Sequence, residues 1–152
     1  MVELLSLSIG LGLAVSLLFV EIFGVAVGGM VVPGYVALYL DQPVVVAITL
    51  GIGLLTYGAV HALSSVVIIY GRRRTVLMIV FGYILVMALA LAARSIAPLA
   101  GLEVLTIGYI IPGLLAIWMD RQGVTVTICS LLIAAVVVRL LLILTVGGEL
   151  EL

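Results

Sequence analysis

The sequence has little charge for its length. Only 9% of its 152 residues are charged, lysine is absent, and 66% of the residues are hydrophobic. A soluble domain usually carries about a quarter charged residues, so this chain has too few to cover a surface that faces water. The composition excludes an ordinary soluble domain and predicts an integral membrane protein with one membrane domain over residues 1–152.

Residues that bind metals or attack substrates are also scarce. With one histidine (His61) and one cysteine (Cys129), the chain cannot build a zinc site or an internal disulfide. No phosphate-binding loop and no nucleophile elbow occurs, and no basic aromatic patch suits nucleic acid. We therefore expect no catalytic, cofactor or metal site in this chain, and we expect Cys129 to be a small buried hydrophobe.

Six apolar runs can be marked along the sequence. A helix needs about 20 residues to cross the hydrocarbon core of a bilayer, and two of the runs are short for this purpose and contain a Pro-Gly pair. These two could cross as broken helices or dip into the membrane and return. We expect an all-α, multi-pass helix bundle whose first run is a retained helix. The runs cover residues 4–20, 24–40, 44–70, 76–93, 102–119 and 124–146.

The two short runs share a motif. VVPGYVALYLDQP at 31–43 is followed 79 positions later by IIPGLLAIWMDRQ at 110–122. The motif predicts two halves of three segments each, about residues 1–71 and 75–152. Proline removes a backbone donor, and irregular backbone within a membrane is tolerated only against protein or around a wet cavity. We expect both pairs to face inward, although each could be an ordinary proline kink. The candidate positions for a helix break, or for the lining of such a wet cavity, are Pro33, Gly34, Pro112 and Gly113.

The arginines predict the orientation. Arg72, Arg73 and Arg74 form the only charge cluster, and such clusters stay on the cytoplasmic side. If all six runs cross, the two halves are inverted relative to each other, which is the interpretation we favour. If the short runs re-enter, the halves are parallel. The cluster is a topology determinant first, and it could also contact an acidic partner or an anionic chain.

The remaining polar residues in or beside the runs each have a structural interpretation. His61 is expected to make an interhelical hydrogen bond or to pack in neutral form, with proton transfer or ligand contact as the alternative. Arg139 either reaches the interface or pairs with a carboxylate. Asp41 and Asp120 are expected to be turn residues, and Glu21 to lie at a helix end near the interface. Besides the arginine cluster, the candidates for contact with a partner are Glu21, Asp41, Gln42, Glu103 and Gln122.

An ordered set of segments resembles a known family, the small membrane component of poly-gamma-glutamate synthase (the CapC/PgsC family of capsule biosynthesis). The order and spacing agree over about residues 20–130. The segments are VVPGYVALYLDQP at 31–43, LLTYG at 54–58, IIYGRRR at 68–74, IGYIIPG at 107–113 and RQGVTVT at 121–127.

The resemblance implies a role that the composition does not show. It implies a non-catalytic component of the cell membrane, which supports a cytoplasmic ATP-dependent amide ligase and helps export the polymer. ATP and Mg²⁺ would belong to the ligase, and an accessory extracellular-facing subunit and further copies of this chain are also expected. The alternatives are a stand-alone transporter built from inverted repeats and a purely structural membrane anchor.

Overall fold

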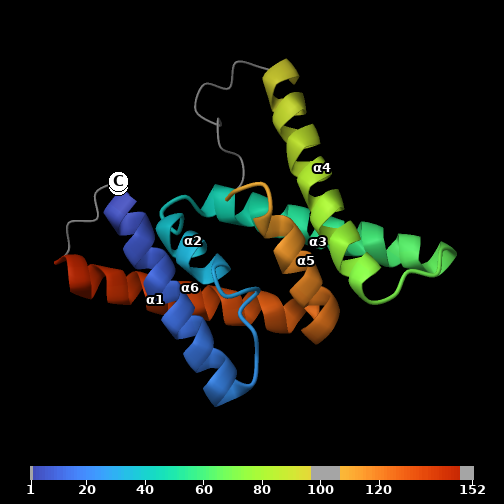
Figure 1. Ribbon diagram of the computed structural model, residues 1–152. Coiled ribbons are helices and arrows are strands. Elements are labelled where there is room, and N and C mark those ends of the chain that lie inside the picture. Colours follow the sequence, from blue (N-terminus) through green and yellow to red (C-terminus); the bar gives the residue numbers. More distant parts are fainter. Residues whose placement is uncertain (1, 97–106, 148–152) are drawn as a thin grey trace.

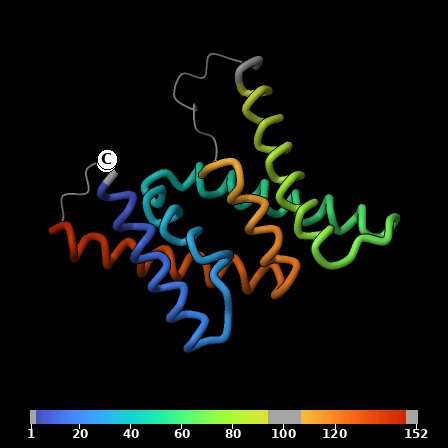
Figure 2. The backbone as a smooth tube through the Cα atoms, in the orientation of Figure 1, coloured from blue at the N-terminus to red at the C-terminus, as the bar shows by residue number. Residues whose placement is uncertain are grey.

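The computed structural model describes residues 2–96 and 107–147, and all regular structure in these ranges is α-helical. Figure 1 shows the helices, and Figure 2 shows the path of the chain between them. The predicted all-α architecture is confirmed. The helices are α1 (Val2–Phe23), α2 (Val32–Leu38), α3 (Pro43–Val66), α4 (Arg72–Ile96), α5 (Ile111–Gln122) and α6 (Val124–Val146).

Four helices, α1, α3, α4 and α6, are long and apolar enough to cross a membrane. They correspond to the four apolar runs that lack a Pro-Gly pair. Their candidate spans hold 21 to 24 residues, which matches the length that a bilayer requires. Many large apolar side chains on these helices are exposed, as expected for surfaces that contact lipid rather than water. The prediction of a membrane helix bundle is therefore confirmed for the described part of the chain.

The two short runs form short helices. With 7 and 12 residues, α2 and α5 extend about 10 and 18 Å, against about 30 Å of hydrocarbon. Neither helix can cross alone. Pro33 and Pro112 stand in the first turn of their helices, where a missing N–H costs no hydrogen bond. The prolines thus begin helices and do not kink them, and the helical part of each run is shorter than the run.

The chain before α2 is irregular because glycines permit it. Gly28 has a φ of +77°, a conformation that side chains with a Cβ rarely adopt. A Cβ on Gly28 would also lie 2.8 Å from a methyl group of Leu115 in α5. Gly108, before α5, has a φ of +71°. Both short helices are therefore entered from a glycine turn, which places their proline ends inside the bundle.

The halves pack across one another. Helix α2 contacts α1 of its own half and α6 of the other half, and α5 contacts α4 and α3 in the corresponding way. In Figure 1, α1 and α4 run in opposite directions, and so do α3 and α6. Each short helix therefore lies against long helices from both halves, and α5 also contacts α6. The inverted orientation of the halves across a membrane stays a prediction.

The space between the short helices is filled by apolar side chains. Val32 and Val36 from α2 join Leu115 and Met119 from α5 in one buried cluster, with Leu131 of α6. Pro33, Gly34, Pro112 and Gly113 are buried as well. The irregular backbone before the helices is thus accommodated against protein, which is one of the two arrangements that the sequence allows.

Candidate functional site

The first Pro-Gly pair is held against α1 by direct backbone contact. A Cβ built on Gly34 would lie 2.7 Å from the carbonyl oxygen of Ser8, and one built on Gly12 would lie 2.7 Å from the nitrogen of Gly34. The Ser8 hydroxyl donates a hydrogen bond of 2.7 Å to the carbonyl of Gly34. Only glycine permits this approach. The pair therefore fixes α2 to the helix that precedes it.

The second pair repeats this contact on α4. A Cβ on Gly113 would lie 2.8 Å from the Cα of Ile79 and 3.0 Å from the carbonyl oxygen of Met78. A Cβ on Gly82 would lie 2.8 Å from the Cα of Gly113. The repeat that the sequence shows as a motif is therefore also a repeated glycine-to-glycine contact in three dimensions. Both short helices are docked onto the first helix of their half.

A glutamine connects the two halves. The Ala26 N–H donates to Oε1 of Gln122 at 3.1 Å, and Nε2 of Gln122 donates back to the Ala26 carbonyl at 2.5 Å. Nε2 also donates to the Thr127 hydroxyl at 3.2 Å, and Ser130 donates to the Ala26 carbonyl at 3.2 Å. The side chain of Gln122 thus replaces the regular backbone partners that the irregular segment before α2 lacks.

A threonine has the corresponding role in the first half. The hydroxyl of Thr49, which is 1% exposed, accepts a hydrogen bond of 3.0 Å from the N–H of Ile107 and donates one of 2.7 Å to the Val45 carbonyl. Helix α3 thereby holds the chain that leads to α5, as α6 and Gln122 hold the chain that leads to α2. Sequence reasoning missed Thr49, because nothing in a local pattern identifies a partner 58 positions away.

Replacing Gln122 should loosen the segment before α2. In Gln122→Leu the Ala26 N–H loses its acceptor and its carbonyl keeps only Ser130, so we expect a loss of about 1–2 kcal/mol in the free energy of unfolding. Thermal unfolding of the purified protein in a neutral detergent measures the effect. Gln42→Leu is the matched control, because Gln42 is an exposed glutamine near the end of the first motif. Equal unfolding temperatures for the two variants would contradict this assignment.

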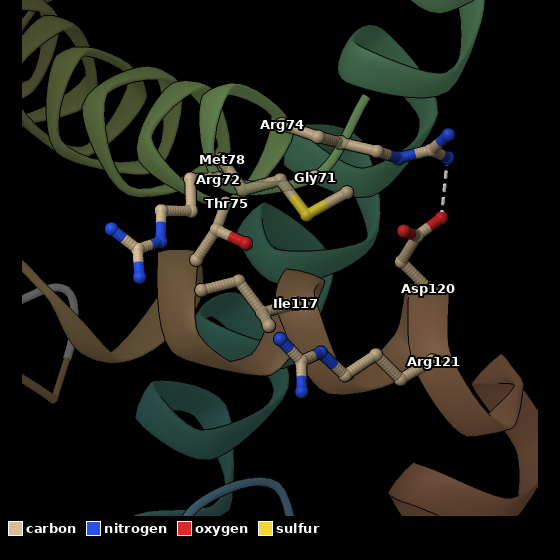
Figure 3. A pocket seen from close by; sticks show the side chains of 8 residues that line it. All are labelled: Gly71, Arg72, Arg74, Thr75, Met78, Ile117, Asp120 and Arg121. Carbon is tan, nitrogen blue, oxygen red and sulfur yellow. Dashed lines mark hydrogen bonds and ion pairs between the residues drawn. The ribbon is translucent and has the colours of Figure 1, made fainter. Parts of the chain in front are cut away.

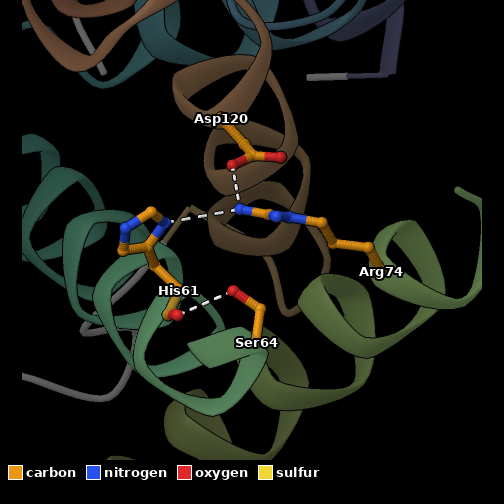
Figure 4. A network of polar contacts seen from close by, with 4 residues as sticks. All are labelled: His61, Ser64, Arg74 and Asp120. Atoms are coloured by element: carbon orange, nitrogen blue, oxygen red, sulfur yellow. Dashed lines mark hydrogen bonds and ion pairs between the residues drawn. The ribbon is translucent and has the colours of Figure 1, made fainter. Parts of the chain in front are cut away.

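An ion pair joins α5 to α4 where the arginine cluster begins. Arg74 donates from a terminal guanidinium nitrogen to the Asp120 carboxylate, and each side chain is 23% exposed. The same nitrogen lies 3.4 Å from Nδ1 of His61, a residue of α3 whose carbonyl accepts a hydrogen bond from Ser64 (Figure 4). Asp120 is thus more than a turn residue. It binds Arg74 of α4, which in turn contacts His61 of α3.

A second ion pair occupies the matching place in the first half. Arg139 of α6 donates to the Asp41 carboxylate at 2.5 Å and to the Ala37 carbonyl at 3.1 Å. Of the two alternatives for Arg139, pairing with a carboxylate is the one found. Asp41 lies in the turn after α2, as expected, whereas Asp120 lies within the last turn of α5, and each of the two also binds an arginine. Asp41 is 53% exposed, which makes its pair the more hydrated of the two.

An open pocket adjoins the Arg74–Asp120 pair. It has a volume of about 370 Å³ and lies between the start of α4 and the end of α5 (Figure 3). The guanidinium group of Arg121 lies 5.6 Å from the centre of the Trp118 ring, a cation–π contact. The pocket brings Arg72 and Arg74 together with Arg121, which lies far away in the sequence. Its lining residues are Gly71, Arg72, Arg74, Thr75, Met78, Ile117, Asp120 and Arg121.

The other candidates lie apart from this pocket. Glu21 and Arg73 are exposed, and Gln42 precedes α3 without a side-chain capping bond. Glu103 lies outside the described residues. Cys129 is exposed on α6, so the expectation that it is buried is wrong. It lies beside Phe19 and Phe23 on an apolar surface, where burial by protein is not needed to keep a small hydrophobe away from water.

Comparison with known proteins extends the resemblance seen in the sequence. The model of a family described as "Capsule biosynthesis CapC" matches residues 11–128. The "PGA biosynthesis protein CapC" of Bacillus subtilis (strain 168) is 40% identical over 124 residues, which cover 81% of this chain and 83% of that protein. The "Capsule biosynthesis protein CapC" of Bacillus anthracis is 38% identical over 125 residues, with 82% and 83% covered. No solved structure matches the chain.

Proposed function

The chain belongs to the CapC family of capsule biosynthesis proteins, and from this premise we propose that it is the membrane subunit of a complex that makes poly-gamma-glutamate. The family match carries the proposal, because it extends over both Pro-Gly motifs and the arginine cluster. Four helices of membrane-spanning length support a role within the bilayer. The name of the Bacillus subtilis relative, a PGA biosynthesis protein, supports the choice of polymer.

In this proposal the chemistry belongs to a partner. A cytoplasmic amide ligase binds ATP and Mg²⁺, activates the gamma-carboxylate of glutamate as an acyl phosphate and forms the amide bond. This chain anchors the ligase at the membrane, together with an accessory subunit that faces outward. The exposed arginines at the α3–α4 turn are suited to contact an acidic surface or product at that side.

The product is a polyanion, so its export needs a wet path through protein. The buried cluster between α2 and α5 fills the centre of the described chain with valine, leucine and methionine side chains. We therefore place the proposed path between several copies of the chain, or between this chain and another subunit. In this arrangement the Pro-Gly pairs shape the helices that border the path, and they do not themselves bind polymer.

The complex can be tested in cells of the source organism. Deletion of the gene should abolish polymer formation, and the tagged protein should co-purify in mild detergent with a ligase that hydrolyses ATP when glutamate is added. Restoring the gene is the control. The proposal would be overturned if polymer synthesis and export continued without the gene, or if purified protein alone carried substrate across liposomes. The latter result would indicate a stand-alone transporter.

The orientation has its own test. We expect the Arg72–Arg74 loop to be cytoplasmic in the plasma membrane. In a Cys129→Ser background, a cysteine at Arg73 should be labelled by an impermeant maleimide only after the cells are opened. A cysteine at Glu149 should be labelled in intact cells if the segments of α2 and α5 complete crossings, as the inverted interpretation requires, and only in opened cells if the four long helices alone cross. Labelling of the Arg73 position in intact cells would reverse the proposed topology.

A further inference from the structure

The pocket beside the Arg74–Asp120 pair is electropositive. Three guanidinium groups and one carboxylate line it, which leaves a formal excess of two positive charges. Thr75 adds a hydroxyl group, and Met78 with Ile117 forms an apolar wall. No other group with negative charge is among the described lining residues. The electrostatic character of the pocket therefore favours an anion.

The three arginines are not equivalent. Arg74 is bound to Asp120 and contacts His61, so it belongs to the wall of the pocket. Within the described residues, neither Arg72 nor Arg121 makes an ion pair. Both are exposed, and both line the pocket. They approach it from different helices, α4 and α5, so a ligand held by both would connect the two helices.

The arrangement suits carboxylate groups. A guanidinium group presents paired donors that match the two oxygens of a carboxylate. A volume of about 370 Å³ lies at the small end of the range for ligand pockets, roughly 300–1,000 Å³. This size admits a short stretch of an extended chain and excludes a folded surface. Two separated donors are better suited to successive carboxylates of one chain than to a single compact anion.

We propose that Arg72 and Arg121 form a binding site for successive carboxylates of an acidic chain, with Arg74 and Asp120 fixing the geometry between them. This inference rests on the proposed function, which supplies the class of ligand, a gamma-linked glutamate chain. It also changes the assignment made from the sequence. The binding group is not the consecutive cluster Arg72–Arg74, because Arg73 does not line the pocket and Arg121 replaces it.

The protein contains a reporter for this site. Trp118 is the only tryptophan in the chain, and its ring contacts the guanidinium group of Arg121. A ligand that draws Arg121 into the pocket should therefore change the tryptophan emission. Titration of the full chain in neutral-lipid nanodiscs with a short gamma-linked glutamate oligomer should give a saturable change, and isothermal titration calorimetry gives the affinity independently of the reporter.

Variants locate the site. Loss of one charged hydrogen-bonding group costs about 1.5–3 kcal/mol, so Arg72→Gln and Arg121→Gln should each weaken oligomer binding about tenfold or more. Arg73→Gln removes the same charge from the adjacent position outside the pocket and is the matched control for diffuse attraction. Its effect on the affinity should be about twofold or less. Equal weakening by all three variants would overturn the site, as would the absence of saturable binding.

Competition with other anions tests whether the pocket prefers the carboxylates of a glutamate chain to phosphate groups. Inorganic phosphate and nanodiscs with anionic lipid should compete only weakly; competition as strong as that of the oligomer would overturn the carboxylate assignment. If the wild-type protein binds no oligomer and the ligase no longer co-purifies with the Arg72→Gln variant, the pocket is a contact for the ligase. That result would also overturn the carboxylate assignment. If polymer synthesis needs this gene but the purified chain binds no oligomer, only the proposed carboxylate site is refuted. Oligomer binding by a chain that is dispensable for polymer synthesis refutes only the proposed function.

Discussion

Gly113→Ala and Gly34→Ala should be among the most damaging small substitutions in the described part of the chain. The added methyl group would meet backbone atoms of α4 or α1 at 2.7–3.0 Å, and backbone cannot move aside as a flexible side chain can. Overpacking of this kind costs about 1–3 kcal/mol at each site. We expect each variant to lower the unfolding temperature in detergent by an amount on the order of 5 °C.

The double variant should lose assembly and polymer production, because both short helices are displaced together. Gly58→Ala and Gly51→Ala in α3 are the matched controls, since a Cβ at either position meets nothing within 4 Å. Alanine is also the better helix former, by about 1 kcal/mol. If Gly113→Ala unfolds at the same temperature as Gly58→Ala, the glycine contact does not hold α5 against α4.

Asp120→Asn should have an effect of similar size. The substitution leaves the Arg74 guanidinium without its carboxylate at a position only 23% exposed, where Arg74 already has a buried Nε with no partner in the described chain. Loss of a charged hydrogen bond there should cost about 1.5–3 kcal/mol. Urea unfolding in detergent micelles, or thermal unfolding where urea is ineffective, gives the change in stability.

A double-mutant cycle separates the pair from its surroundings. Arg74→Gln combined with Asp120→Asn should be less damaging than the sum of the single changes, since neither partner remains charged and unpaired. The corresponding change in the first half, Asp41→Asn, should cost less than about 1 kcal/mol, because Asp41 is 53% exposed and Arg139, although only 14% exposed, keeps its hydrogen bond to the Ala37 carbonyl. Additive effects of Arg74→Gln and Asp120→Asn would show that the ion pair does not couple α4 to α5.

The sequence predicts where the helices lie better than it predicts which residues contact one another across them. Hydrophobic runs locate the four long helices, because run length and composition are local properties. The motif that recurs after 79 residues locates the two short helices, and their glycines explain how they can pack closely enough to be buried. The pairing of Asp120 with Arg74, 46 positions away, and of Gln122 with Ala26, 96 positions away, depends on how the halves pack. No local pattern carries that information.

The pocket residues likewise could be predicted from the sequence only in part. The arginine cluster is evident in the sequence, but its members separate in three dimensions. Arg74 enters an ion pair, Arg73 does not line the pocket, and Arg72 is joined by Arg121. Residue type alone assigns Cys129 to the interior, yet a cysteine in a membrane helix can face the lipid at little cost. The separation of the arginines and the exposure of Cys129 both depend on which face of each helix points into the bundle. A continuous apolar run does not define that face.

The crossed packing of the halves has a consequence for biosynthesis. Helix α2 rests on α1, which precedes it, and on α6, the last of the described helices that the ribosome produces. During translation the first three helices therefore enter the bilayer with one side of α2 uncovered, and Asp41 has no Arg139 to pair with until α6 is made. The N-terminal half cannot complete its packing as an independent unit. Chains truncated before α6 should be recognised as unfinished by membrane quality control, however well their first helices insert.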